Sequence, residues 1–91
     1  MRLVWTLDAY HDRETIYDYI EAEDPIAALS LDMRFEEAAG HLVEHPQAGR
    51  LGRVQGTREL VAHRHYVLVY DLLEDTVRIL RVLHTARQWP L

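Results

Sequence analysis

The residues best suited to chemistry lie in the second half of the chain. Arg58 stands in a short, mostly apolar stretch, and Arg81, His84 and Arg87 follow one another at intervals of three near the end. A guanidinium group makes paired hydrogen bonds to a carboxylate or a phosphate, and an imidazole exchanges protons near neutral pH. These side chains could therefore bind an anionic partner or act on a phosphate group.

The charge distribution points to the same half of the chain. The net charge is -5, but residues 1–48 carry three arginines against eleven acids, whereas residues 49–91 carry seven arginines against four acids. All ten basic residues are arginine. This polarity predicts that the C-terminal half meets an anionic partner, either a nucleic acid or an acidic peptide.

Two pairs of histidines have spacings that occur in metal sites. His41 and His45 are four residues apart in a helical pattern, and His63 and His65 are two apart in a strand pattern. The chain has no cysteine, and no acid completes either pair at a recognisable spacing. We therefore predict no metal site and no cofactor.

The first half of the sequence predicts one strand and two helices. Residues 2–7 alternate as a strand, with Leu3, Trp5 and Leu7 on one face, and Asp8 is the expected cap of the helix that follows. That helix runs to about Glu23, with Ile16, Tyr17, Tyr19 and Ile20 on its buried side and Asp12, Glu14, Asp18 and Glu21 mostly in water. Asp24-Pro25 begins a second helix, which Pro46 ends. The short connection requires an antiparallel hairpin.

The second half changes to a strand pattern. Residues 47–56 contain three glycines and predict a loop with a brief extended stretch. Strands are expected at 57–62, 66–72 and 76–84, and the run 66–70 is apolar on both faces, which is typical of a central strand. The predicted fold class is α+β, in the order β-α-α-β-β-β, with the helical hairpin packed on a mainly antiparallel sheet.

Length and composition place few further limits on the protein. Residues 1–91 are expected to form a single domain, with 48% hydrophobic and 27% charged residues as in ordinary globular proteins. The apolar run at the N-terminus is too short for a signal peptide, and no segment approaches a membrane span. We expect a cytoplasmic protein without a membrane partner.

Five short motifs in this order resemble the RelE/ParE family of toxins, over nearly the whole chain from Trp5 to Pro90. The family's patterns are an acid or Asn followed by Pro-x-Ala-Ala, then Pro-x-x-Gly-Arg, Gly-Thr-Arg-Glu-Leu, Tyr-x-Leu-Val-Tyr, and Val-x-His-x-Ala-Arg-x-Trp-Pro. The matching segments here are Asp24-Pro25-Ile26-Ala27-Ala28, His45-Pro46-Gln47-Ala48-Gly49-Arg50, Gly56-Thr57-Arg58-Glu59-Leu60-Val61, Tyr66-Val67-Leu68-Val69-Tyr70 and Ile79-Leu80-Arg81-Val82-Leu83-His84-Thr85-Ala86-Arg87-Gln88-Trp89-Pro90.

The resemblance implies a type II toxin whose partner is a cognate antitoxin, with two mechanisms in the family. RelE-like members cut mRNA on the ribosome, whereas ParE-like members bind DNA gyrase. The nuclease branch places cations in the central strand and in the strand before it, but Val67 and Leu60 stand there in this chain. The sequence therefore favours a ParE-like gyrase inhibitor. The alternatives are a RelE-like ribosome-dependent endoribonuclease and an inactive antitoxin-binding module.

The residues expected to carry function follow from these alternatives. A nuclease would use Arg58, Arg81, His84 and Arg87 as its catalytic candidates. Contacts to antitoxin or target are expected at Arg50, Arg53, Arg58, Leu60, Val67, Arg81 and Arg87. Purely structural roles are the alternative for some of these residues. Glu59 is expected in a structural ion pair, His84 could be a hydrogen-bonded core residue, and Trp89-Pro90 could hold the chain end. We further expect Leu60, Val67 and Val69 to leave an exposed apolar surface that a folding antitoxin segment covers.

Overall fold

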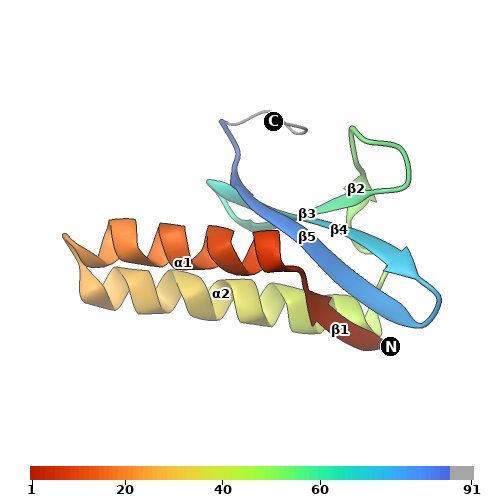
Figure 1. Cartoon of the computed structure of the whole chain (residues 1–91), viewed down its shortest axis with the longest axis horizontal. Coiled ribbons are helices and arrows are strands. Elements are labelled where there is room, and N and C mark those ends of the chain that lie inside the picture. Colours follow the sequence, from red (N-terminus) through yellow and green to blue (C-terminus); the bar gives the residue numbers. More distant parts are fainter. Residues whose placement is uncertain (87–91) are drawn as a thin grey trace.

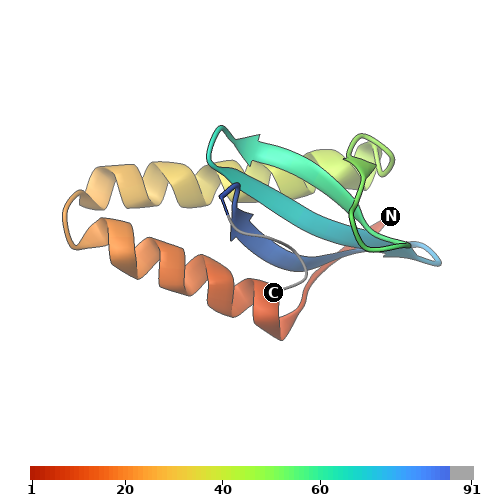
Figure 2. The ribbon, with the colours of Figure 1, turned by 90° about the horizontal axis from the view of Figure 1, so that it is seen from above.

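In the computed structural model, which describes residues 1–86, two helices and a five-stranded sheet follow the predicted order. The elements are β1 (Arg2–Trp5), α1 (Leu7–Glu21), α2 (Pro25–Glu44), β2 (Arg50–Leu51), β3 (Arg58–His63), β4 (Tyr66–Leu73) and β5 (Thr76–His84). The helices lie side by side as a hairpin against the sheet (Figures 1 and 2). The predicted α+β fold class is therefore confirmed.

The sheet order is β1-β5-β4-β3-β2, so β4 is the central strand, as its apolar sequence predicted. β1 runs parallel to β5, and the other neighbours are antiparallel. The brief extended stretch expected in the loop is β2, which pairs Arg50 with Glu59 and Leu51 with Arg58. The long strands begin or end within about one residue of their predicted bounds.

The second helix begins as the sequence predicted. The Asp24 carboxylate accepts a hydrogen bond from the Ala27 amide at 3.0 Å, and Pro25 occupies the first turn. Phe35, Ala39 and Leu42 of this helix pack against Leu68, Tyr70 and Ile79 of the sheet to form the core. This packing covers only one face of the sheet, which we call the helix-covered face.

The prediction for the first helix was wrong at Asp8, Leu7 and Tyr19. Thr6, not Asp8, is the cap: its hydroxyl accepts a hydrogen bond from the Ala9 amide at 3.2 Å. β1 ends at Trp5, so Leu7 belongs to the helix and is 71% exposed. Tyr19 is 81% exposed and outside the buried stripe, whereas Ile16 and Ile20 do pack on the core. The apolar pattern alone could not separate Tyr19 from its neighbours, because tyrosine occurs on both wet and buried faces.

Candidate functional site

The strand register separates the predicted site residues onto opposite faces of the sheet. Arg58 pairs with Tyr70 and Leu60 with Leu68, and both partners belong to the core beneath the helices. Directly paired residues share a face, so Arg58 and Leu60 lie on the helix-covered face. Val67 points the other way and forms a second cluster with Val69 and Leu83. The expectation that Leu60 shares one sheet face with Val67 and Val69 was therefore wrong, whereas contacts of Arg58, Leu60 and Val67 with antitoxin or target stay a prediction.

Arg58 holds the loop that leads from α2 into the sheet. Its Nη1 atom donates to the carbonyl oxygen of Gly49 at 2.8 Å and to that of Gln47 at 3.4 Å. Tyr70 acts on the same loop, since its hydroxyl donates to the Pro46 carbonyl at 2.8 Å and accepts from the Gly49 amide at 2.9 Å. A side chain at position 49 would collide with the Tyr70 ring, because a Cβ there would lie 2.7 Å from it. These contacts position β2 and its arginine, Arg50.

Removing the Tyr70 hydroxyl should loosen this loop. In Tyr70→Phe the buried Gly49 amide loses its partner, so we expect the free energy of unfolding to fall by about 1–3 kcal/mol. Urea denaturation followed by circular dichroism measures the change. Tyr10→Phe is the matched control, because Tyr10 is exposed on α1 and should change stability by less than about 0.5 kcal/mol. Equal effects of the two substitutions would contradict this role of Tyr70.

The face opposite the helices, which we call the helix-free face, is the first candidate site. Its centre is Val67, Val69 and Leu83, all buried, under a hollow of only about 40 Å³. The expected exposed apolar surface at Leu60, Val67 and Val69 is therefore wrong. The remaining side chains and backbone around the hollow come from Arg50, Arg53, Glu59, His84 and Thr85.

Paired charges surround this apolar centre. Glu59 is 6% exposed, and its carboxylate accepts from the Arg50 guanidinium at 3.1 Å and from the Arg53 amide at 3.3 Å, as an ion pair expected from the sequence. On the neighbouring strands Arg78 makes a bidentate pair with Asp71 at 2.8 and 2.6 Å. The hydrogen bonds to Asp71 raise the pKa of Arg78.

The strand register pairs Arg81 with Val69 of the helix-free face, but the Arg81 guanidinium is bound to α1. The guanidinium donates hydrogen bonds to the Asp12 carboxylate of α1 at 2.7 and 3.0 Å. The same carboxylate accepts a hydrogen bond from the Val82 amide at 2.9 Å. β1 pairs with β5 only as far as Ile79, so Asp12 satisfies an edge amide that has lost its strand neighbour. The prediction that Asp12 lies mostly in water was wrong for this reason. The hydrogen bond to Asp12 raises the pKa of Arg81.

The remaining predicted site residues are Arg53, His84 and Arg87. Arg53 is exposed, and His84 lies at the end of β5 with its Nδ1 atom accepting from the Ala86 amide at 3.0 Å. Arg87, together with Trp89 and Pro90, lies outside the described residues. Within residues 1–86, no three histidine or acidic side chains lie close enough together to hold a metal ion. In the same part of the chain, no helix has the length and apolar character of a membrane span.

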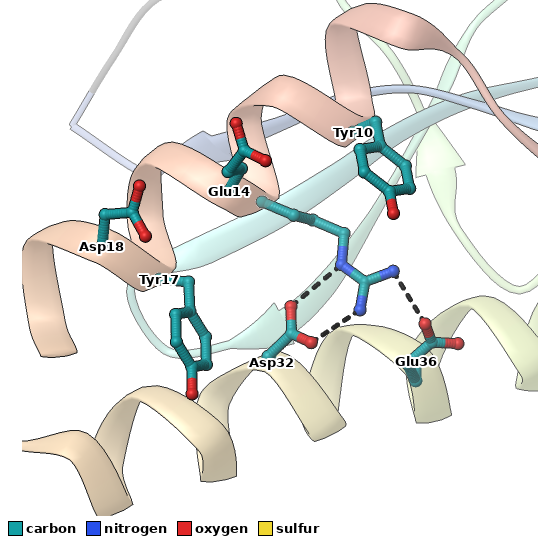
Figure 3. Close-up of a pocket in the computed structure, with 7 residues that line it drawn as sticks. Tyr10, Glu14, Tyr17, Asp18, Asp32 and Glu36 are labelled. Carbon is teal, nitrogen blue, oxygen red and sulfur yellow. Dashed lines mark hydrogen bonds and ion pairs between the residues drawn. The ribbon is translucent and has the colours of Figure 1, made fainter.

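A second hollow, of about 280 Å³, lies between the helices (Figure 3). Tyr10, Glu14, Tyr17 and Asp18 of α1 and Asp32 and Glu36 of α2 surround Arg13. The Arg13 guanidinium contacts Asp32 at 2.8 and 3.0 Å and Glu36 at 2.8 Å, and lies 4.4 Å from the Trp5 ring. Burial opposes this charge, but the two carboxylates outweigh it and the pKa of Arg13 is raised. This set joins the helices to each other and to β1.

Known proteins resemble this chain both in fold and in sequence. A chromosomal ParDE toxin–antitoxin system from P. aeruginosa has a chain with a TM-score of 0.83 and 30% identity, covering 92% of this chain and 95% of that one. Toxin RelE2 of Caulobacter vibrioides is 40% identical over 94% of this chain and 97% of its own length. The protein Y4kP of Sinorhizobium fredii is 43% identical over 98% and 93%.

The fold and these relatives define a small toxin of the RelE/ParE class. The model of the family described as "ParE toxin of type II toxin-antitoxin system, parDE" matches residues 3–89. The chain belongs to this family. Membership implies a cognate antitoxin as its partner.

Proposed function

We propose that this toxin inhibits DNA gyrase and that its antitoxin neutralises it. The observation that carries the proposal is the state of charge on the helix-free face. Arg50 and Arg78 are paired with Glu59 and Asp71, and the centre between them is aliphatic. Among the described residues around the hollow, Arg53 is the one arginine whose guanidinium has no carboxylate partner, and the Glu59 carboxylate beside it is already bound to Arg50.

Cleavage of RNA makes different demands on such a face. The 2′-hydroxyl must lose a proton, and cations must stabilise the charge that develops on the phosphate oxygens. A guanidinium that is already paired with a carboxylate does little to stabilise negative charge on a phosphate. The buried Glu59 carboxylate also repels a phosphate group. The hollow of about 40 Å³ is also far smaller than the several hundred Å³ of an ordinary ligand pocket. A binding surface for a protein target has none of these requirements.

Ribosome-dependent mRNA cleavage is the second candidate function. The observation in its favour is the 40% identity to a protein named Toxin RelE2, whose name belongs to the nuclease branch. The chain would then act through Arg53, His84 and Arg87. Arg53 and His84 lie around the hollow of the helix-free face, and Arg87 lies outside the described residues.

A supercoiling assay tests the proposal directly. The toxin, freed from its antitoxin, should block ATP-dependent supercoiling of relaxed plasmid by purified gyrase in a dose-dependent way. Addition of one equivalent of antitoxin should restore supercoiling and serves as the control. Unchanged gyrase activity at a tenfold molar excess of toxin, together with growth arrest on expression, would contradict the proposal.

A further inference from the structure

Three histidines converge where the β3–β4 turn meets the end of β5. We call His63, His65 and His84 the histidine end. The His65 and His84 rings stack in parallel at 5.6 Å between centroids, and the His63 and His65 rings are 5.9 Å apart. Tyr66 joins the group edge-on to His84 and connects it to Phe35 in the core. The turn and the end of β5 are also joined by a hydrogen bond from the Thr85 amide to the His65 carbonyl at 2.8 Å.

The surroundings of the histidine end are positively charged. Arg34 of α2 and Arg64 of the turn lie near His63, and burial, Arg34, His65 and Arg64 lower the pKa of His63. From α1, Asp12 faces the groove beside His84, but its carboxylate is already occupied by Arg81 and the Val82 amide. The histidine end is therefore a cationic site without an acidic residue of this chain committed to it among the described groups.

The hydrogen bonds assign different roles to the three imidazoles. The Nδ1 atoms of His63 and His84 accept from the amides of His65 and Ala86, at 3.4 and 3.0 Å. A neutral imidazole that accepts at Nδ1 carries its proton on Nε2, so both rings present an outward donor. His65 is exposed, and within the described residues its ring has no hydrogen-bond partner. Both of its ring nitrogens are therefore available to a group on a binding partner.

A groove with both apolar and polar side chains continues from this cationic site. It measures about 390 Å³ and runs between α1 and the edge of β5 that β1 leaves uncovered. One side is formed by α1, with Asp12, Thr15, Ile16 and Tyr19, and the other by the sheet, with Tyr66, Val82 and His84. A groove that offers Ile16, Val82 and two tyrosines beside a cationic end fits a peptide segment that carries apolar side chains and an acidic one.

We propose that the histidine end receives an acidic side chain of the antitoxin, whose apolar neighbours lie in the groove beside α1, and that His65 takes up a proton when it does. This inference rests on the antitoxin partnership of the proposed function and not on the identity of the target. A carboxylate within about 4–6 Å stabilises imidazolium, so binding and proton uptake are linked.

An acidic protein segment fits this location better than a nucleic acid. The cationic site is small, and it adjoins the half of the chain that carries eleven acids against three arginines. A long phosphate backbone that reached the histidine end would meet repulsion from the helices, whereas a short peptide can confine its negative charge to the histidines.

Calorimetric titration of the toxin with its antitoxin at several pH values tests the inference. If binding raises the proton affinity of one ordinary histidine tenfold, the Kd falls about sixfold from pH 8 to pH 6, because uptake of the proton then accompanies binding. The same titration in buffers of different ionisation enthalpy should then show uptake of about half a proton near neutral pH. The double variant His65→Asn with His84→Asn should lose most of this uptake and of the pH dependence.

The chain provides a matched control for this variant. His41 and His45 form another exposed ring pair, at 4.7 Å, at the C-terminal end of α2. His41→Asn with His45→Asn should bind antitoxin with the proton uptake of the unaltered protein. Asparagine retains an acceptor near the position of Nδ1, so the bond from the Ala86 amide can persist in the first variant. Thermal unfolding confirms that both variants fold.

Three outcomes would overturn the inference. The first is equal proton uptake in the two double variants. The second is an antitoxin affinity that does not depend on pH in the unaltered protein, while the complex still forms and the antitoxin partnership stands. The third is binding to a duplex DNA oligonucleotide that only the His65/His84 variant loses, which would assign the histidine end to nucleic acid. If no complex forms at any pH, both the inference and the partnership of the proposed function fail.

Discussion

Ribosomes programmed with a short message should show no codon-positioned cuts at toxin concentrations that half-inhibit gyrase supercoiling. A ribosomal nuclease needs cations around the cleaved phosphate, and losing one such group costs about 3–4 kcal/mol of activation free energy, or roughly a hundred- to a thousandfold in rate. Val67 is apolar and buried, and Arg58 lies on the helix-covered face, bound to Gly49. Two cationic contributions are therefore missing together.

Primer extension on the ribosome-bound message measures this result at single-nucleotide resolution. A known ribosome-dependent nuclease toxin in a parallel reaction shows that the ribosomes are competent for cleavage. Antitoxin added before the toxin identifies any cut that a contaminant makes, since contaminating nuclease activity would persist.

The opposite result would move the chain to the nuclease branch. It would consist of cuts at a fixed codon position that disappear in Arg53→Ala, His84→Ala or Arg87→Ala while the variants still bind antitoxin. Such cuts would mean that these side chains supply the charge that the described ion pairs withhold.

Local signals in the sequence were enough to predict most of the fold. The Asp24-Pro25 pair begins α2 because a carboxylate cap and a proline both suit the first turn, and the apolar run of β4 requires burial on both faces. Glycines in the loop before β3 and the Glu74-Asp75 turn separate the strands. Each of these signals is contained within a few residues.

The two faces of the sheet could not be assigned by the same reasoning. The alternation of β3 shows that Arg58 and Leu60 point the same way, but it does not show whether that way leads to the helices. The register settles it, because Leu60 pairs with Leu68 and Arg58 with Tyr70. A candidate site drawn from neighbouring sequence positions was therefore divided between a core face and the helix-free face.

The ion pair between α1 and β5 could not be predicted from the sequence either. Asp12 and Arg81 are 69 residues apart, and helical periodicity places Asp12 among exposed acids. The pair forms because β1 stops at Trp5 and α1 then takes the place of a strand beside β5. The same geometry opens the groove next to the histidine end. The predicted pairing of Glu59 succeeded because its partner Arg50 lies on the adjacent, locally connected strand.

Replacement of Asp12 by alanine should lower the free energy of unfolding by about 3 kcal/mol. The substitution removes the bidentate partner of the largely buried Arg81 guanidinium, and it leaves the Val82 amide without its acceptor. The Asp12 and Arg81 side chains are 17% and 18% exposed, so water replaces the contact only in part. Urea denaturation measures the loss, and Asp18→Ala, at an exposed position of the same helix, should change stability by less than about 0.5 kcal/mol. A double-mutant cycle is completed by Arg81→Met and by the double variant Asp12→Ala with Arg81→Met. The coupling free energy between the two side chains should be about 1.5 kcal/mol or more. A coupling near zero, with Asp12→Ala no worse than Asp18→Ala, would show that α1 is held beside β5 by its apolar contacts alone.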